Sequence, residues 1–443
     1  MRIQLSEHFT YQKLFRFVLP SIIMMIFTSI YGVIDGLFVS NFVGKTAFAS
    51  INLIMPLLMG LSALGFMIGT GGSAIVSKAL GEGKRELANQ YFSMLVCVSV
   101  LGGIFLAAAG MFLLRPIAIL LGATGEMVEL CVLYGRILLI SLMPFLLQNV
   151  FQSFFVTAEK PQLGLKVTIA AGLTNIALDY LFIAVFHWGI VGAAVATAFS
   201  EAIGGLFPIL YFARKNNSLL RLVKAQIDFK ALLKACANGS SELMTNLSLS
   251  VVNSLYNLQL ISIAGENGVA AYGTIMYVNF IFIAIFLGYS IGSAPIIGYH
   301  FGAGNHSELK SLLQMSLSLA GGCGVVLVLL AQALASPLAN IFVGYDSELA
   351  AMTCHGFRLY AVSFLICGFN IFGSAFFTAL SNGIVSATIS FLRTLVFQVA
   401  VVLTLPIVLG IDGIWFAVTA AEALTLVITV GFLVNRRNQY HYG

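Results

Sequence analysis

The feature that most constrains this chain is a series of long apolar runs joined by short polar connections. A helix needs about 20 predominantly apolar residues to cross roughly 30 Å of hydrocarbon. Twelve runs reach that length, at residues 14–40, 47–77, 90–114, 128–155, 164–186, 190–212, 232–262, 268–300, 310–335, 348–379, 384–409 and 413–434. Only 9% of the 443 residues are charged, against about 25% in soluble domains. The sequence therefore predicts an all-α membrane protein with twelve transmembrane helices.

The positions of lysine and arginine predict how these helices are oriented. Seventeen of the 22 lie at the termini or in connections on the same side as the termini, whereas Lys45 and Arg115 lie on the opposite side. Because cytoplasmic connections are enriched in these residues, we expect both termini in the cytoplasm. The same distribution accounts for the net charge of +5, so that charge does not indicate a nucleic-acid partner.

The two halves of the chain resemble each other. The segment GSAIVSKALGEGKREL at 72–87 matches GSAPIIGYHFGAGNHSEL at 292–309. Near the end of each half, HWGIVGAAVATAFSEA matches IDGIWFAVTAAEA, which places Glu201 opposite Glu422. Each half has an even number of predicted spans, so the repeats are parallel and related by an axis along the membrane normal. We expect a first lobe of six helices at 1–215, a cytoplasmic linker at 216–231 and a second lobe of six helices at 232–443.

Four polar residues of the first half fall at similar depths in their predicted spans. Asp35 lies in the outer part of the first span, and Thr197 lies about 10 Å into the sixth, at a rise of about 1.5 Å per residue. Asn175 and Asp179 are four residues apart on the fifth span, so they share one helix face. A carboxylate in hydrocarbon costs at least a few kcal/mol, so acids at this depth usually have a function.

Such a set of oxygen-bearing side chains has two possible roles in binding. It can bind a hard cation such as Na⁺, or Asp35 and Asp179 can share or exchange a proton. The alternative is that each acid is neutral or bonded to the backbone and only ties helices together. We expect Glu201, Glu242 and Glu422 to be supporting acids, although Glu201 and Glu422 follow small-residue runs and are also consistent with packing.

The second half has no copy of this set. Its buried acid, Glu242, begins a polar stripe that continues through Asn246, Asn253 and Asn257. Such a stripe is typical of a helix that lines a water-filled cavity, and the alternative is hydrogen bonding between helices.

A substrate cleft between the two bundles is predicted from aromatic and methionine side chains. Aromatic faces attract organic cations, and methionine adapts to varied shapes. We expect the cleft to include Tyr31, Met55, Met59, Asn253, Tyr256, Asn257, Met276 and Tyr277, with Tyr272 and Tyr289 beside them.

Signatures of enzymes and of bound cofactors are absent from the sequence. No Walker loop, HExxH or GxSxG occurs, so a pump driven directly by ATP has no support. The six cysteines form neither a CxxC motif nor a Cys/His metal spacing. We expect no enzymatic activity and no cofactor other than a coupling ion, Na⁺ or H⁺.

Several segments resemble the MATE (multidrug and toxic compound extrusion) family, and in particular its bacterial branch of DinF-like and MepA-like proteins. The resemblance extends over essentially the whole chain. It is carried by YGVIDGLFVSNFVG (31–44), KALGEGK (78–84), NIALDYLFI (175–183) and GIVGAAVATAFSE (189–201).

This resemblance implies a twelve-helix antiporter of two six-helix lobes in the bacterial inner membrane, which we expect to be a monomer. It would export small organic cations in exchange for Na⁺ or H⁺. The family's cation site uses an Asp on span one, an Asn and an Asp on span five and a Thr on span six. The matching positions are Asp35, Asn175, Asp179 and Thr197. Many relatives have an arginine after span four where this chain has Val156, so no role of that arginine is transferred.

Two other functions are compatible with parts of the sequence. A flippase for lipid-linked oligosaccharides, from the same superfamily, would need a basic central cavity, yet only Arg136, Arg358 and Arg393 lie within spans. A non-transporting receptor or scaffold would have no use for buried acids at matched depths.

Overall fold

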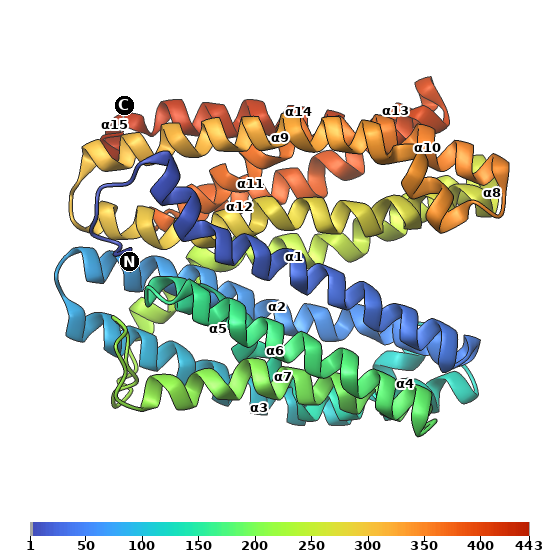
Figure 1. Ribbon diagram of the computed structural model, residues 1–443, viewed down its shortest axis with the longest axis horizontal. Helices are drawn as coiled ribbons and strands as arrows, with labels where there is room; N and C mark the ends of the chain where they lie inside the picture. The colour runs from blue at the N-terminus through green and yellow to red at the C-terminus, as the bar shows by residue number, and fades with distance from the viewer. Residues whose placement is uncertain (1–2, 443) are drawn as a thin grey trace.

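A computed structural model describes residues 3–442, which are almost entirely helical (Figure 1). The first half contains α1 (Tyr11–Phe42), α2 (Lys45–Gly81), α3 (Arg85–Leu120), α4 (Glu126–Ile140), α5 (Leu142–Thr157), α6 (Pro161–Asp179), the π-helix η1 (Tyr180–Val185) and α7 (Gly189–Ala213). The second half contains α8 (Phe229–Gly302), α9 (His306–Val343), α10 (Ser347–Ala361), α11 (Phe364–Ala379), α12 (Gly383–Phe391), the π-helix η2 (Leu392–Val396), α13 (Phe397–Leu409), α14 (Ile411–Asn435) and α15 (Arg437–Tyr440).

The number of membrane-length helices agrees with the prediction once the breaks are considered. In the described part of the chain, nine helices are long and apolar enough to span a membrane, or eleven with two bent pairs counted as one span each. One of the nine, the 74-residue α8, is interrupted at Gly265, where φ is 63° and ψ is −152°. It turns back at the end of the molecule opposite the termini (Figure 1). With α8 counted as two spans, each of the twelve predicted spans has a counterpart.

Two spans predicted as continuous are broken. The axes of α4 and α5 differ by 55°, and those of α10 and α11 by 48°. The first break follows from Pro144, because proline has no N–H to donate to the carbonyl of Ile140, where α4 ends. The second break contains no proline, and nothing in the structure explains it.

The helices form two groups, with α1 running obliquely between them (Figure 1). Separate apolar cores fill the groups: one includes Ile54, Tyr134 and Ala193 of the first half, and another includes Leu260 and Trp415 of the second half. A further core joins the start of the chain to α11, because Leu14 and Phe17 pack in the same cluster as the α11 phenylalanines. The beginning of α1 therefore packs against the second half, while its later part faces the first.

The two groups touch through the backbones of α2 and α8, and this contact includes the end that carries both termini. A Cβ atom at Gly81 would lie 1.9 Å from the carbonyl oxygen of Tyr299, and one at Gly302 would lie 2.1 Å from that of Lys78. Only glycine permits this direct backbone contact between α2 and α8. Farther along α1, a Cβ at Gly32 would meet nothing within 4 Å. The groups are therefore in direct backbone contact near the terminus end, whereas Gly32 lies beside open space that belongs to a cavity.

Candidate functional site

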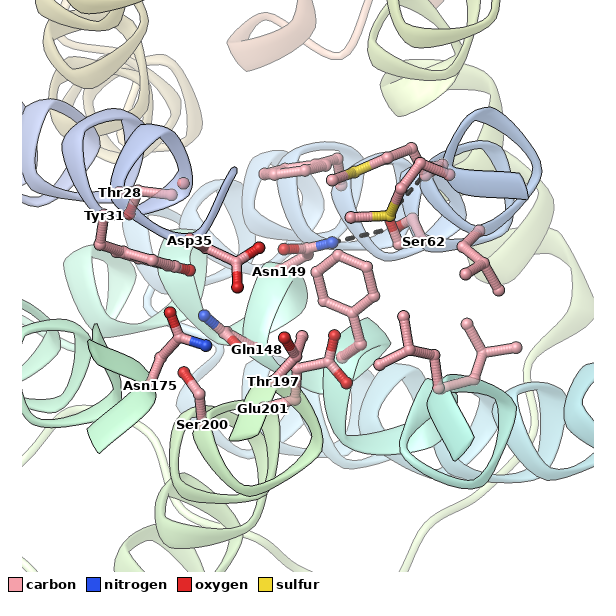
Figure 2. Close-up of a pocket in the computed structure, with 18 of the residues that line it drawn as sticks. Thr28, Tyr31, Asp35, Ser62, Gln148, Asn149, Asn175, Thr197, Ser200 and Glu201 are labelled. Atoms are coloured by element: carbon pink, nitrogen blue, oxygen red, sulfur yellow. Dashed lines mark hydrogen bonds between the residues drawn. The ribbon is translucent and has the colours of Figure 1, made fainter. Parts of the chain in front are cut away.

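A cavity of about 260 Å³ lies in the first half (Figure 2). Helices α1, α2, α4, α5, α6 and α7 contribute to its wall, and α8 adds Asn246. Its polar residues include Thr28, Tyr31, Asp35, Ser62, Gln148, Asn149, Gln152, Asn175, Thr197, Ser200 and Glu201. Its apolar residues include Met25, Met55, Leu58, Met59, Phe66, Leu138, Leu142 and Phe145. A mixed wall of this kind suits a ligand with an apolar body and a polar or charged group.

The four residues matched by depth in the sequence lie together in space. Asp35, Asn175 and Thr197 line the cavity, and their side chains point into the same space from α1, α6 and α7 (Figure 2). Asp179 is fully buried behind this wall, at the last residue of α6 before η1 begins. Its carboxyl group lies close enough to that of Asp35 for the two to interact electrostatically. π-Helical turns are frequent at functional sites, and η1 begins directly after Asp179.

Each of these four residues also has a buried oxygen without a hydrogen-bond partner. Among the described residues, no partner is found for Asp35 Oδ1, Asn175 Oδ1, Thr197 Oγ1 or either carboxylate oxygen of Asp179. Native proteins satisfy most buried polar atoms, so a group of unsatisfied ones needs an explanation. Carboxylate, amide and hydroxyl oxygens are the ligands of a hard cation, and a proton shared by the two carboxyls would satisfy part of the same set.

Glu201 lies beside this group but has a partner of its own. Its side chain is 6% exposed and accepts a hydrogen bond from the hydroxyl of Ser141, which lies at the break between α4 and α5. The break therefore turns the Ser141 hydroxyl toward the Glu201 carboxylate. In an unbroken helix this hydroxyl would point in another direction.

Three amides on α5 were missed by the sequence analysis. Gln148, Asn149 and Gln152 are all buried and line the cavity. Asn149 donates a hydrogen bond to the carbonyl of Ser62 at 3.1 Å, whereas Oε1 of each glutamine has no partner in the described structure. The sequence contained a signal for them, because QNVFQ places three amides within five residues of an apolar run.

Three of the predicted cleft residues, Tyr31, Met55 and Met59, line the cavity. The predicted residues of the second half do not reach it. Tyr256 is 1% exposed and donates a hydrogen bond to Gln398. The Tyr256 hydroxyl thus has its hydrogen-bond partner within the second half.

The other second-half residues of the predicted cleft also lie outside the cavity. Tyr272 stacks on Tyr256 and donates to Asn253, and Met276 packs on the same core. Tyr277 is 44% exposed and stacks on Phe342, Asn257 is exposed, and Tyr289 donates to Ser316. The lining of this cavity thus includes predicted cleft residues of the first half, and Asn246 extends the second-half polar stripe to it. A cleft shared by both halves stays a prediction.

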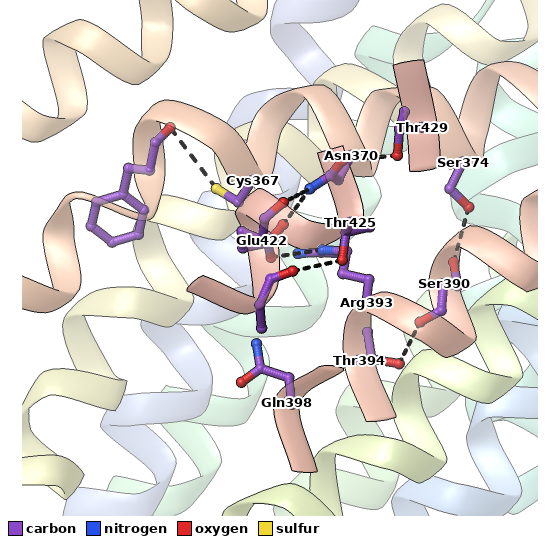
Figure 3. A network of polar contacts seen from close by, with 12 residues as sticks. Cys367, Asn370, Ser374, Ser390, Arg393, Thr394, Gln398, Glu422, Thr425 and Thr429 are labelled. Atoms are coloured by element: carbon purple, nitrogen blue, oxygen red, sulfur yellow. Dashed lines mark hydrogen bonds and ion pairs between the residues drawn. The ribbon is translucent and has the colours of Figure 1, made fainter. Parts of the chain in front are cut away.

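In the second half, Glu422 belongs to a network of polar contacts (Figure 3). Arg393, within η2, donates from Nε to Glu422 Oε1 at 2.8 Å. Asn370 donates to Glu422 Oε2 at 2.7 Å and accepts from Thr429 at 2.8 Å. Glu242, on α8, lies within electrostatic reach of Arg393. The two buried acids of the second half, Glu242 and Glu422, thus both lie near the cation Arg393.

Membrane-length helices in two groups, with a polar cavity inside the membrane-spanning part, define the general class of secondary transporters. The comparison with known families is more specific. Residues 20–181 and 243–404 match the MatE family. The chain therefore belongs to the MATE family, whose members are membrane transporters and not enzymes.

Individual relatives resemble the chain over nearly its full length. It is 25% identical to the "Multidrug export protein MepA" of Staphylococcus haemolyticus, covering 98% of this chain and 95% of the relative. A structure described as the outward-facing conformation of a multidrug resistance MATE transporter has a TM-score of 0.92 at 24% identity, covering 99% and 97%. A transporter of the same superfamily from Pyrococcus furiosus, described as having a binding pocket of reverse polarity, has a TM-score of 0.90 at 24% identity, covering 99% and 97%. The predicted family and fold are confirmed.

Proposed function

We propose that this protein exports small, drug-like organic cations across a bacterial inner membrane in exchange for Na⁺ or H⁺. The observation that carries the proposal is the group of unpartnered buried oxygens on Asp35, Asn175, Asp179 and Thr197. They adjoin a cavity whose wall includes Tyr31, Met55 and Met59. The MATE family and the name of the staphylococcal relatives support the same function.

The coupling ion would bind where α1 meets α6. Either ion would reduce the repulsion between the Asp35 and Asp179 carboxyls, Na⁺ by lying between them and H⁺ by neutralising one. The carboxamide oxygen of Asn175 and the hydroxyl of Thr197 would complete a Na⁺ site. Because the same oxygens serve both ions, the choice between Na⁺ and H⁺ requires a transport measurement.

Ion binding would act on substrate through α1. Asp35 lies on the same helix as Tyr31 and Gly32, which line the cavity, while Leu14 at the start of α1 packs with the second half. A change in how Asp35 is held would therefore alter both the cavity wall and the packing between the groups. The ion drives the exchange to the extent that it binds the two arrangements with different affinity.

The arrangement of the halves fits alternating access between two lobes, at residues 1–215 and 232–443 with a linker at 216–231. From the excess of lysine and arginine in connections on the terminus side, we expect the termini in the cytoplasm. The tight contact of Gly81 and Gly302 would then close the cytoplasmic side, which corresponds to an outward-open state of a monomer.

The flippase alternative has less support from the cavity. A pyrophosphate-bearing substrate needs cations to neutralise it, and the described residues that line the cavity include no lysine or arginine. Arg393 is paired with Glu422. The cavity is thus better suited to cationic than to anionic substrates.

Efflux of a fluorescent organic cation from cells that express the protein tests the proposal. We expect Asp35→Asn and Asp179→Asn each to abolish most efflux, because neither amide can bind a proton or carry the charge that holds Na⁺. Asp412→Asn is the matched control, since Asp412 is an exposed acid paired with His355. Wild-type efflux by both cavity variants would overturn the coupling role.

A further inference from the structure

A second cavity, of about 530 Å³, lies near the end of the molecule that carries the termini. It is formed where the first turns of α1 and α6 lie beside each other. Six of its residues matter here: Arg16, Phe17, Pro20, Lys160, Leu163 and Lys166. It is separate from the candidate cation site, because Arg16 and Asp35 are 19 residues apart on α1, or about 28 Å at 1.5 Å per residue.

The charge of this cavity is positive. Arg16 and Lys166 are exposed, and neither has an ion-pair partner among the described residues. Lys160 adds a third cation. Glu159 is the acid in the described lining, but it is 7% exposed and accepts a hydrogen bond from the backbone N–H of Leu5 at 2.8 Å. The cations therefore outnumber the acid, whose carboxylate is engaged by the N-terminal segment.

On α1, an exposed apolar face follows Arg16, the exposed cation that this helix contributes to the cavity. Residues seven apart on a helix lie on nearly the same face. Ile23 and Ile30 follow Arg16 at that spacing and are 40% and 39% exposed.

The same pattern occurs on α6 and the start of η1. Leu173 and Tyr180 follow Lys166 at sevens and are 55% and 59% exposed. Two apolar faces thus run from the basic cavity toward the opposite end of the molecule.

We propose that this cavity binds the phosphate of an anionic phospholipid, with the acyl chains lying along the exposed faces of α1 and α6. Basic pockets between helices at the cytoplasmic side of a membrane suit anionic headgroups. The cavity lies where the predicted first and fifth spans begin, which is the level of the headgroups in the leaflet on the terminus side. A soluble phosphate could use Arg16 and Lys166, but only a lipid would also cover the two apolar faces.

Mass spectrometry of the intact protein, released from detergent micelles that contain defined lipids, tests this proposal. The probes are phosphatidylglycerol, which is anionic, and phosphatidylcholine, which is zwitterionic and has similar chains. The wild type is expected to retain phosphatidylglycerol preferentially. Arg16→Gln/Lys166→Gln should lose this preference, by about fivefold for each cation removed. The matched control is Lys215→Gln/Lys224→Gln, which removes two exposed cations outside the cavity.

Three results would overturn the proposal. One is equal retention of the two lipids by the wild type, and another is an equal loss of preference in the cavity and control variants. The third is displacement of phosphatidylglycerol by excess inorganic phosphate, which would indicate a site for soluble anions. If the double variant does not fold, Arg16→Gln and Lys166→Gln are measured singly against Lys215→Gln. The readout is lipid retention, so it does not depend on transport.

Discussion

At the scale of single residues, Glu201 and Glu422 occupy matched positions in the two repeats but have different partners. Glu201 accepts a hydrogen bond from Ser141 and lines the same cavity as Asp35. Glu422 is paired with Arg393. A fixed cation in one half and unpartnered oxygens in the other explain why we assign ion coupling to the first half alone.

The Arg393–Glu422 pair gives a test of stability. Arg393→Met leaves the Glu422 carboxylate buried without its cation, which should destabilise the protein by about 3–5 kcal/mol. Arg393→Met/Glu422→Gln removes both charges and should recover most of that loss. Thermal unfolding in detergent measures both. Equal melting temperatures for the single and double variants would contradict the assigned role of the pair.

The buried amides of α5 give a test of substrate binding. Gln152→Leu replaces an unpartnered polar atom of the cavity with an apolar group of similar size. We expect the fold to be retained, the apparent affinity for a polar cationic dye to fall by several-fold, and that for an apolar one to change less. Dye binding measured by fluorescence checks this, and equal changes for both dyes would argue against contact with Gln152.

Sequence reasoning succeeded for residues whose position follows from helix geometry alone. Depth along a span brought Asp35, Asn175, Asp179 and Thr197 together, and the structure places them side by side. Sequence reasoning did not place side chains whose direction depends on the rotation of a helix about its axis. Tyr256 and Tyr272 face their own core because Gln398 and Asn253 satisfy their hydroxyls, and no local pattern contains those contacts.

At the scale of elements, the breaks and π-helices recur in both halves. The bent pair α4–α5 corresponds to α10–α11. The predicted fifth and eleventh spans each contain a π-helix, η1 and η2, at different positions along the span. Hydropathy predicts the length of a span but has no information about its direction, so the sequence analysis missed these irregularities, although Pro144 was a signal for the first break. They matter because Asp179 directly precedes η1 and Arg393 lies within η2.

The glycine contact between α2 and α8 leads to a prediction about conformation. Gly81→Ala/Gly302→Ala places methyl groups where the backbones now touch, so the two groups should separate at the terminus end. Spin labels at Lys84, in the turn after α2, and at His306, the first residue of α9, should then report a longer distance. Gly102→Ala is the control, because a Cβ there meets nothing within 4 Å. An unchanged distance in the double variant would contradict the proposed closure.

At the scale of the whole molecule, the orientation is a prediction from charge that labelling can check. In a cysteine-free background, Arg115→Cys should react with a membrane-impermeant maleimide added to intact cells, whereas Lys84→Cys should react only after the cells are opened. The two positions lie on opposite sides in the predicted topology. The reverse pattern would invert the orientation and place the closed end outside.

The central claim is that an ion bound by Asp35 and Asp179 drives export of an organic cation. Flux in proteoliposomes tests it most directly, with a Na⁺ gradient and a pH gradient imposed separately across a panel of cationic dyes. The wild type should move dye against its gradient when one of these is applied, and Asp179→Asn should respond to neither. The claim would be contradicted if dye movement by the wild type depended on neither gradient. It would also be contradicted if Asp179→Asn moved the dye as the wild type does.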